Sequence, residues 1–148
     1  MILCTGNSCR SQMAEGILRH YGADKFEVFS AGSSPPRPTR SSDESRLGPS
    51  QVNPIAIEVM KEIGIDISHH RSKHLNEFLS QPFDFVITVC DSANETCPIF
   101  PGEYQKLHWP FPDPPHDEDV SPLVIKEFRK VRDMILGKFR VFGEKGNP

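Results

Sequence analysis

Hydrophobic positions in this chain follow two alternating spacings. Short, mostly apolar runs predict strands at residues 1–3, 26–30, 83–89 and, more weakly, 105–108. Apolar residues three or four positions apart predict helices over residues 11–21, 53–63 and 121–139, with a shorter helix at 75–79. Asn53-Pro54 and Ser121-Pro122 each supply a capping residue followed by a first-turn proline, so they mark the starts of two helices.

The alternation of strands and helices predicts the fold class. We expect an α/β protein, with a doubly wound parallel four-stranded sheet and helices on both faces. The run at 83–89 is apolar almost throughout, which is typical of a strand covered on both sides. The last helix should bury a stripe of apolar side chains, namely Leu123, Phe128, Val131, Ile135, Leu136 and Phe139.

The chain is expected to form one domain over residues 1–148, because its length suits a single core. Residues 33–51 interrupt the pattern with several prolines and serines. This insertion is either a tolerated surface loop or a flap over the active site.

The composition of the chain argues against nucleic acid, membrane and metal partners and indicates the cellular compartment. A net charge of −3 gives no basic field for nucleic acid, and no apolar run reaches the ~18 residues of a membrane span. We find no signal peptide ahead of Cys4 and therefore expect a cytoplasmic protein, whose four cysteines would be free thiols. Their C-x4-C and C-x6-C spacings do not suit zinc, and the histidines at 69–74 are expected to be solvated, so we predict no metal.

The strongest local signal is the loop between the first strand and the first helix. It reads Cys4-Thr5-Gly6-Asn7-Ser8-Cys9-Arg10-Ser11. Gly6 and Asn7 tolerate left-handed backbone angles, so the turn can point its N–H groups inward at an oxyanion. The helix N-terminus and the forked guanidinium of Arg10 would bind the same anion. Cys4 would then be a nucleophile whose thiolate is stabilised by this positive surrounding.

Two further candidates should lie near this loop. Ligands of parallel sheets bind beyond the carboxyl ends of the strands, where Cys4, Cys90 and Asp113 are all expected. Asp113 is either a general acid for a departing oxygen or simply a turn residue before proline.

Cys90 and Cys97 form a possible redox pair. Seven residues rise ~10 Å along a helix, whereas a disulfide needs Cα atoms within ~7 Å. The two thiols can therefore pair only if the segment between them is a loop or unwinds. Alternatively, they are two inert, partly buried cysteines.

Cys4 to Gly16 closely resembles the active-site loop of thioredoxin-coupled arsenate reductases, which share the fold of low-molecular-weight protein tyrosine phosphatases. The resemblance extends over Ser30–Gly32, Val52–Ser68, Val89–Pro98 and His108–Pro114. Residues 33–51 have no counterpart. The Cys90-x6-Cys97 pair separates the reductases from the phosphatases.

The resemblance implies a relay of three thiols. Cys4 attacks arsenate held by the loop and Arg10, and Asp113 assists the loss of hydroxide or water. Cys90 then attacks the Cys4–arsenic adduct, arsenite leaves, and a Cys4–Cys90 disulfide forms. Cys97 attacks Cys90 in turn, which gives a Cys90–Cys97 disulfide that thioredoxin reduces. Cys9 would support the loop without joining the relay. Phosphate and sulfate would compete with arsenate, and no bound cofactor is expected.

Some members of that family bind potassium beside the loop through Asn, Glu, Ser and Asp side chains. Asn7, Glu15 and Ser30 match three of them, and Lys73 stands in the fourth position. We therefore expect the Lys73 ammonium to take the place of the cation.

Two other functions stay open at this point. A tyrosine phosphatase would use Cys4, Arg10 and Asp113 without the relay, although Pro115 stands where phosphatases usually have an aromatic residue. The third possibility is an anion-binding or redox-sensing protein without turnover. In each case we expect a monomer.

Overall fold

The computed structural model describes residues 1–35, 52–115 and 120–148, so most of the predicted 33–51 insertion lies outside the described residues. The strands are β1 (Ile2–Cys4), β2 (Ser30–Gly32), β3 (Phe85–Thr88) and β4 (Gln105–His108). The helices are α1 (Arg10–Tyr21), α2 (Pro54–Lys61), α3 (Asp91–Glu95) and α4 (Pro122–Lys145), with a 3-10 helix η1 (Leu75–Phe78).

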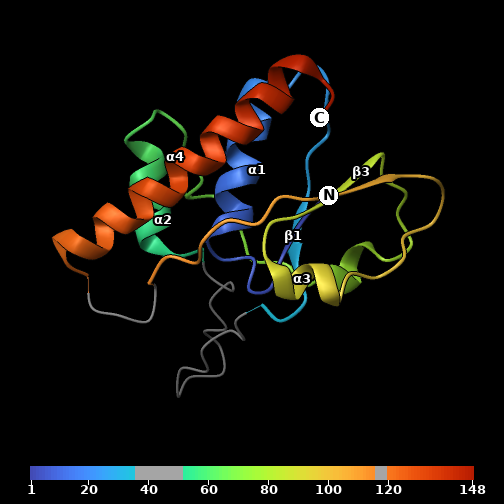
Figure 1. The fold of residues 1–148 in the computed structure, drawn as a ribbon, viewed down its shortest axis with the longest axis horizontal. Coiled ribbons are helices and arrows are strands. Elements are labelled where there is room, and N and C mark those ends of the chain that lie inside the picture. Colours follow the sequence, from blue (N-terminus) through green and yellow to red (C-terminus); the bar gives the residue numbers. More distant parts are fainter. Residues whose placement is uncertain (36–51, 116–119) are drawn as a thin grey trace.

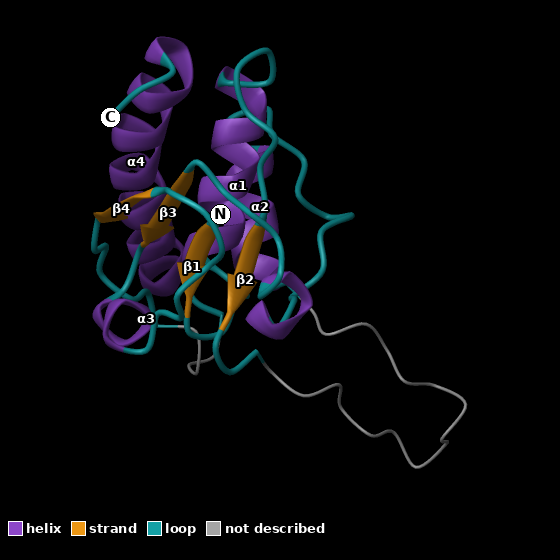
Figure 2. Ribbon diagram, turned by 90° about the vertical axis from the view of Figure 1, so that its right-hand side faces the viewer, coloured by secondary structure: helices purple, strands orange, loops and turns teal. Residues whose placement is uncertain are grey.

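The four strands form one parallel sheet in the order β2-β1-β3-β4, which confirms the predicted doubly wound α/β class. β1 lies in the interior, where Ile2 is in register with both Ser30 and Ile87. Figure 1 shows α1 and α4 side by side, and in Figure 2 these helices and α2 lie behind the sheet. The short helices α3 and η1 lie toward the lower end of the sheet in that view.

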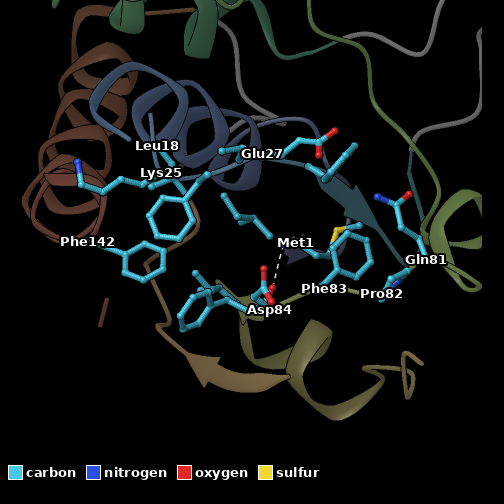
Figure 3. A pocket seen from close by; sticks show the side chains of 15 residues that line it. Met1, Leu18, Lys25, Glu27, Gln81, Pro82, Phe83, Asp84 and Phe142 are labelled. Atoms are coloured by element: carbon cyan, nitrogen blue, oxygen red, sulfur yellow. Dashed lines mark hydrogen bonds between the residues drawn. The ribbon is translucent and has the colours of Figure 1, made fainter. Parts of the chain in front are cut away.

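The strand predicted at 26–30 is shorter than expected, because β2 begins only at Ser30. β1 begins at Ile2, whose N–H donates to Phe29 O at 2.8 Å, so residues 26–28 have no neighbouring β1 residues to pair with. They instead line a cavity of about 150 Å³, together with Met1 and residues 81–85 (Figure 3). This cavity lies at the amino ends of the strands, opposite the predicted active site.

Helix α4 supplies much of the core. The Ser121 hydroxyl accepts a hydrogen bond from the Val124 N–H at 3.2 Å and caps the helix as predicted. Most of the predicted stripe is buried, but Leu123 is 68% exposed, and Val124 is buried in its place. Leu123 lies in the first turn of α4, where Val124, and not Leu123, faces the core. None of the helices in the described part of the chain has the length and apolar content that a membrane span requires.

Candidate active site

The loop predicted to bind an oxyanion connects the carboxyl end of β1 to the first turn of α1. Asn7 has a positive φ of 49°, as expected, whereas Gly6 does not adopt a left-handed angle. The buried Asn7 amide explains why the turn is fixed. Its Nδ2 donates to Ser11 Oγ at 2.8 Å and Ser30 Oγ at 2.9 Å, and its Oδ1 accepts from the Lys73 N–H at 2.8 Å.

Neighbouring elements press closely on the same loop. A Cβ atom added to Gly32, at the end of β2, would lie 2.5 Å from the Thr5 carbonyl oxygen, so a larger residue cannot fit without moving the backbone. The N–H groups of Ser34 and Asn53 donate to Thr5 O at 2.9 Å and Ser8 O at 2.8 Å. The loop is therefore held from β2 and from the cap of α2.

The loop forms one wall of a cavity of about 480 Å³. The remaining lining residues are Cys90, Ser92 and Asp113, which come from α3, its N-cap and the segment after β4. Cys4, Cys90 and Asp113 are thus brought together as predicted. Cys97 does not line the cavity; it lies at the far end of α3, partly buried, and its Sγ is 3.5 Å from Pro98 O.

Arg10 lines this cavity, and two contacts hold its guanidinium in place. Its Nη1 donates to the Phe111 carbonyl oxygen at 3.0 Å, and its Nη2 lies 3.4 Å from Asp113 Oδ1. The Arg10 side chain is largely buried, while Asp113 is half exposed. The guanidinium is therefore oriented beside the loop, and a carboxyl group lies next to it.

The Cys4 and Cys90 side chains hydrogen-bond to each other, so their thiols ionise as a pair. The bond from Cys4 lowers the pKa of Cys90 to about 5, and the Thr5 hydroxyl, 3.4 Å from Cys90 Sγ, acts in the same direction. The same bond to Cys90 raises the pKa of Cys4, and burial adds to the effect. The coupled pair therefore carries one negative charge between its two sulfurs, and Cys4 as the attacking thiolate stays a prediction.

Cys9 is the fourth cysteine and lies at the N-cap of α1. Burial raises the pKa of its thiol to about 12, even though Arg10 is close. Cys9 therefore stays protonated at neutral pH and fills space beneath the loop, in keeping with a supporting role.

A buried polar network lies under the loop and includes the predicted cation-site residues. Ser30 Oγ donates to Glu15 Oε2 at 3.2 Å, and His70 Nδ1 lies 3.1 Å from the same oxygen. Burial alone would raise the pKa of Glu15, but the His70 hydrogen bond and the charge of Lys73 lower it on balance. The Lys73 ammonium itself donates to Arg71 O at 2.9 Å.

The prediction that the histidines at 69–74 are solvated is wrong for His70, whose side chain is only 7% exposed. Two further residues of the site were missed. Gln12 Nε2 donates to Asn7 O, Asn7 Oδ1 and Arg71 O at 2.8–3.0 Å, and Ser92 lines the cavity. No local spacing distinguishes His70 from its neighbours, because its partners on α1 lie more than 50 residues away in sequence.

The chain was compared with protein families, with relatives of known sequence and with solved structures. The sequence profile of the family "Low molecular weight phosphotyrosine protein phosphatase" matches residues 1–144. An arsenate reductase of Halalkalibacterium halodurans is 41% identical over 144 residues, which cover 97% of this chain and 94% of that protein.

Solved structures give the same picture. An arsenate reductase in the phosphate binding state superposes with a TM-score of 0.71 at 31% identity, covering 98% of this chain and 95% of that one. A thioredoxin-dependent arsenate reductase of Corynebacterium glutamicum has a TM-score of 0.59 at 28% identity, covering 95% of this chain and 60% of that one.

Proposed function

Because the chain belongs to the low molecular weight phosphotyrosine protein phosphatase family, we propose that it uses this family's oxyanion loop to reduce arsenate to arsenite. One observation carries the proposal: a second thiol, Cys90, lines the same cavity as Cys4, and its Sγ lies 3.4 Å from the hydroxyl of Thr5, the residue after Cys4. A phosphatase needs only one thiol there. A second thiol within reach gives a Cys4 adduct a route to a disulfide instead of hydrolysis.

In the first step the loop and Arg10 hold arsenate, and Cys4 Sγ attacks the arsenic atom. The two thiols share one proton, which Cys90 holds while the Cys4 thiolate attacks. An arsenic–oxygen bond breaks, and Asp113 donates a proton to the departing oxygen, which leaves as water. The half-exposed carboxyl of Asp113, next to Arg10, can regain that proton from solvent.

In the second step Cys90 attacks Cys4 Sγ. A sulfur–sulfur bond forms, the sulfur–arsenic bond breaks, and its electron pair reduces arsenic from the +5 to the +3 state. The Cys90 proton leaves with the arsenite. Two thiols lose two electrons in total, which balances the reduction.

In the third step the Cys97 thiolate attacks Cys90 and releases Cys4 as a thiolate, and a dithiol protein of the thioredoxin type reduces the new disulfide. The position of Cys97 outside the cavity supports this role, because a protein partner cannot enter the oxyanion site. Ile99, two residues further on, is 90% exposed and gives the partner an apolar contact beside the disulfide.

The alternative is hydrolysis of phosphotyrosine through a Cys4 phosphate ester, which the family name and the loop favour equally. In that reaction Cys90 and Cys97 would have no task. The remaining parts of the proposal are a cytoplasmic location, a monomeric state, one domain with an insertion at 33–51, and no bound metal or other cofactor.

The two functions are separated by coupled assays. Arsenate-dependent NADPH oxidation is measured with thioredoxin and thioredoxin reductase for wild type, Cys90→Ser and Cys97→Ser. We expect sustained turnover only in the wild type, and at most one turnover in Cys97→Ser. Aryl phosphate hydrolysis that survives in Cys90→Ser, with no arsenate turnover in the wild type, would establish the phosphatase instead.

A further inference from the structure

Helix α3 connects two thiols that have to meet in the proposed relay. Cys90 is its N-cap, and Cys97 follows two residues after its last residue, Glu95. In helical form this segment separates the two Cα atoms by more than a disulfide allows. The third step of the proposed relay therefore requires α3 to unwind, and whatever fixes α3 controls that step.

Strand β4 fixes α3 at both ends. His108 Nε2 lies 2.9 Å from Asp91 Oδ1 in the first turn, and the other ring nitrogen of His108 lies 2.8 Å from the buried Thr88 hydroxyl of β3. Lys106 Nζ donates to Asn94 O at 3.4 Å in the last turn. The imidazole of His108 is thus anchored in the sheet and binds the helix at the residue next to Cys90.

We propose that His108 and Asp91 form a latch that keeps α3 helical while Cys90 stays beside Cys4, and that must open before Cys97 reaches Cys90. Both are positioning residues, since neither touches the oxyanion cavity. The inference rests on the proposed relay, because a phosphatase reaction would never require α3 to unwind.

The latched step is a thiol–disulfide exchange without net oxidation. The Cys97 thiolate attacks Cys90 Sγ of the Cys4–Cys90 disulfide, the Cys90–Cys97 bond forms, and Cys4 leaves as a thiolate. The Asp91–His108 contact exists before this step and is lost as α3 unwinds. Its removal should therefore accelerate the step, and it should also favour the Cys90–Cys97 disulfide over the dithiol at equilibrium.

The test compares three exposed substitutions on the same helix. Asp91→Ala removes the latch, and Asp91 is 82% exposed, so the fold does not depend on it. Asp91→Asn loses the charge but keeps an oxygen that can accept from His108. Glu95→Ala is the matched control, which removes a carboxylate from the other end of α3.

Two measurements are made on each full-length protein. Rapid acid quench and thiol alkylation after a single arsenate turnover give the rate at which the Cys90–Cys97 disulfide appears. Equilibration with dithiothreitol gives its reduction potential without arsenate. For Asp91→Ala we expect a rate about three- to tenfold higher and a potential more negative by about 15 to 30 mV.

Asp91→Asn and Glu95→Ala should stay within about twofold of the wild type, since they keep the hydrogen bond. A rate and potential unchanged in Asp91→Ala would overturn the latch while leaving the relay intact. A wild-type protein that forms no Cys90–Cys97 disulfide after arsenate would instead disprove the relay, and the latch with it.

Discussion

At the scale of single residues, the site depends on how two thiols share one negative charge. Cys4 and Cys90 line one cavity at the end of the loop, the hydrogen bond between them lowers the pKa of Cys90, and the Thr5 hydroxyl lies 3.4 Å from Cys90 Sγ. Cys4 and Cys90 together therefore carry one negative charge at neutral pH, and a proton can move from one sulfur to the other.

This sharing predicts a pH titration. In the wild type, thiolate absorbance at 240 nm should rise by one thiolate with a midpoint near pH 5, because the lowered pKa of Cys90 favours the charged form above that pH. Cys4→Ala removes the donor, so the midpoint should move toward the usual thiol value of about 8.5. Cys97→Ser serves as the control and should leave the first midpoint unchanged. A wild-type midpoint above 8 would rule out the shared charge.

A second residue-scale prediction concerns potassium. The Glu15 carboxylate contacts His70 and Arg19, and the positive charge of Lys73 acts on it as well. Because these groups already balance the negative charge of Glu15, a potassium ion should gain little by binding there. Replacing sodium by potassium should change neither the melting temperature nor arsenate turnover of the wild type.

Lys73→Met removes one positive charge beside Glu15 and should restore a response of the melting temperature to potassium. The matched control is Lys61→Met, which removes an exposed lysine from α2. A clear rise in the wild-type melting temperature with potassium would contradict the role of Lys73.

At the scale of elements, the loop is shaped by the strand end that packs against it. β2 ends at Gly32, where an added Cβ would lie 2.5 Å from the Thr5 carbonyl oxygen, so no side chain fits. The N–H of Ser34 then donates to the same carbonyl. The position of the loop is therefore coupled to β2.

Gly32→Ala should displace the loop. We expect a loss of about 1–3 kcal/mol in the free energy of unfolding, measured in urea, from the overpacked Cβ, and at least about a tenfold loss of arsenate turnover. Gly137→Ala is the matched control, because its Cβ would meet no atom within 4 Å and alanine favours the interior of α4. Full activity of Gly32→Ala would show that the loop tolerates the shift.

At the scale of the whole molecule, the site lies at one end of the sheet and α4 supports it from behind. The buried Phe139 ring packs edge-on against Trp109 at 5.3 Å between centroids and lies 6.2 Å from the ring of Phe111. The Phe111 carbonyl in turn orients Arg10. The core thus positions the segment that carries Asp113.

Phe139→Ala should therefore lower the free energy of unfolding by about 3–5 kcal/mol, the usual cost of an aromatic cavity, and should also weaken arsenate binding. Urea unfolding and turnover at varied arsenate concentration measure the two effects. Val141→Ala, at a half-exposed position of the same helix, should cost less than about 1 kcal/mol. Equal effects of the two substitutions would show that Phe139 has no special place in the core.

The sequence by itself determined the order of the elements, the fold class and the edge where Cys4, Cys90 and Asp113 meet. These follow from local signals: apolar spacing, the caps at Asn53 and Ser121, and a loop whose residue types suit an oxyanion. The carboxyl ends of parallel strands lie at one edge of any such sheet. Residues that directly follow these strands are therefore predicted to lie near one another, even when they are far apart in sequence.

Only the tertiary structure decided that Cys4 and Cys90 ionise as a pair, why His70 is buried, where β2 begins, and that His108 binds α3. Each depends on atoms from segments far apart in the chain, such as the Thr5 hydroxyl on Cys90 and Gln12 on His70. Hydrogen bonds of this kind shift the pKa of a group and fix its orientation only once the fold has placed both partners, so no local pattern encodes them.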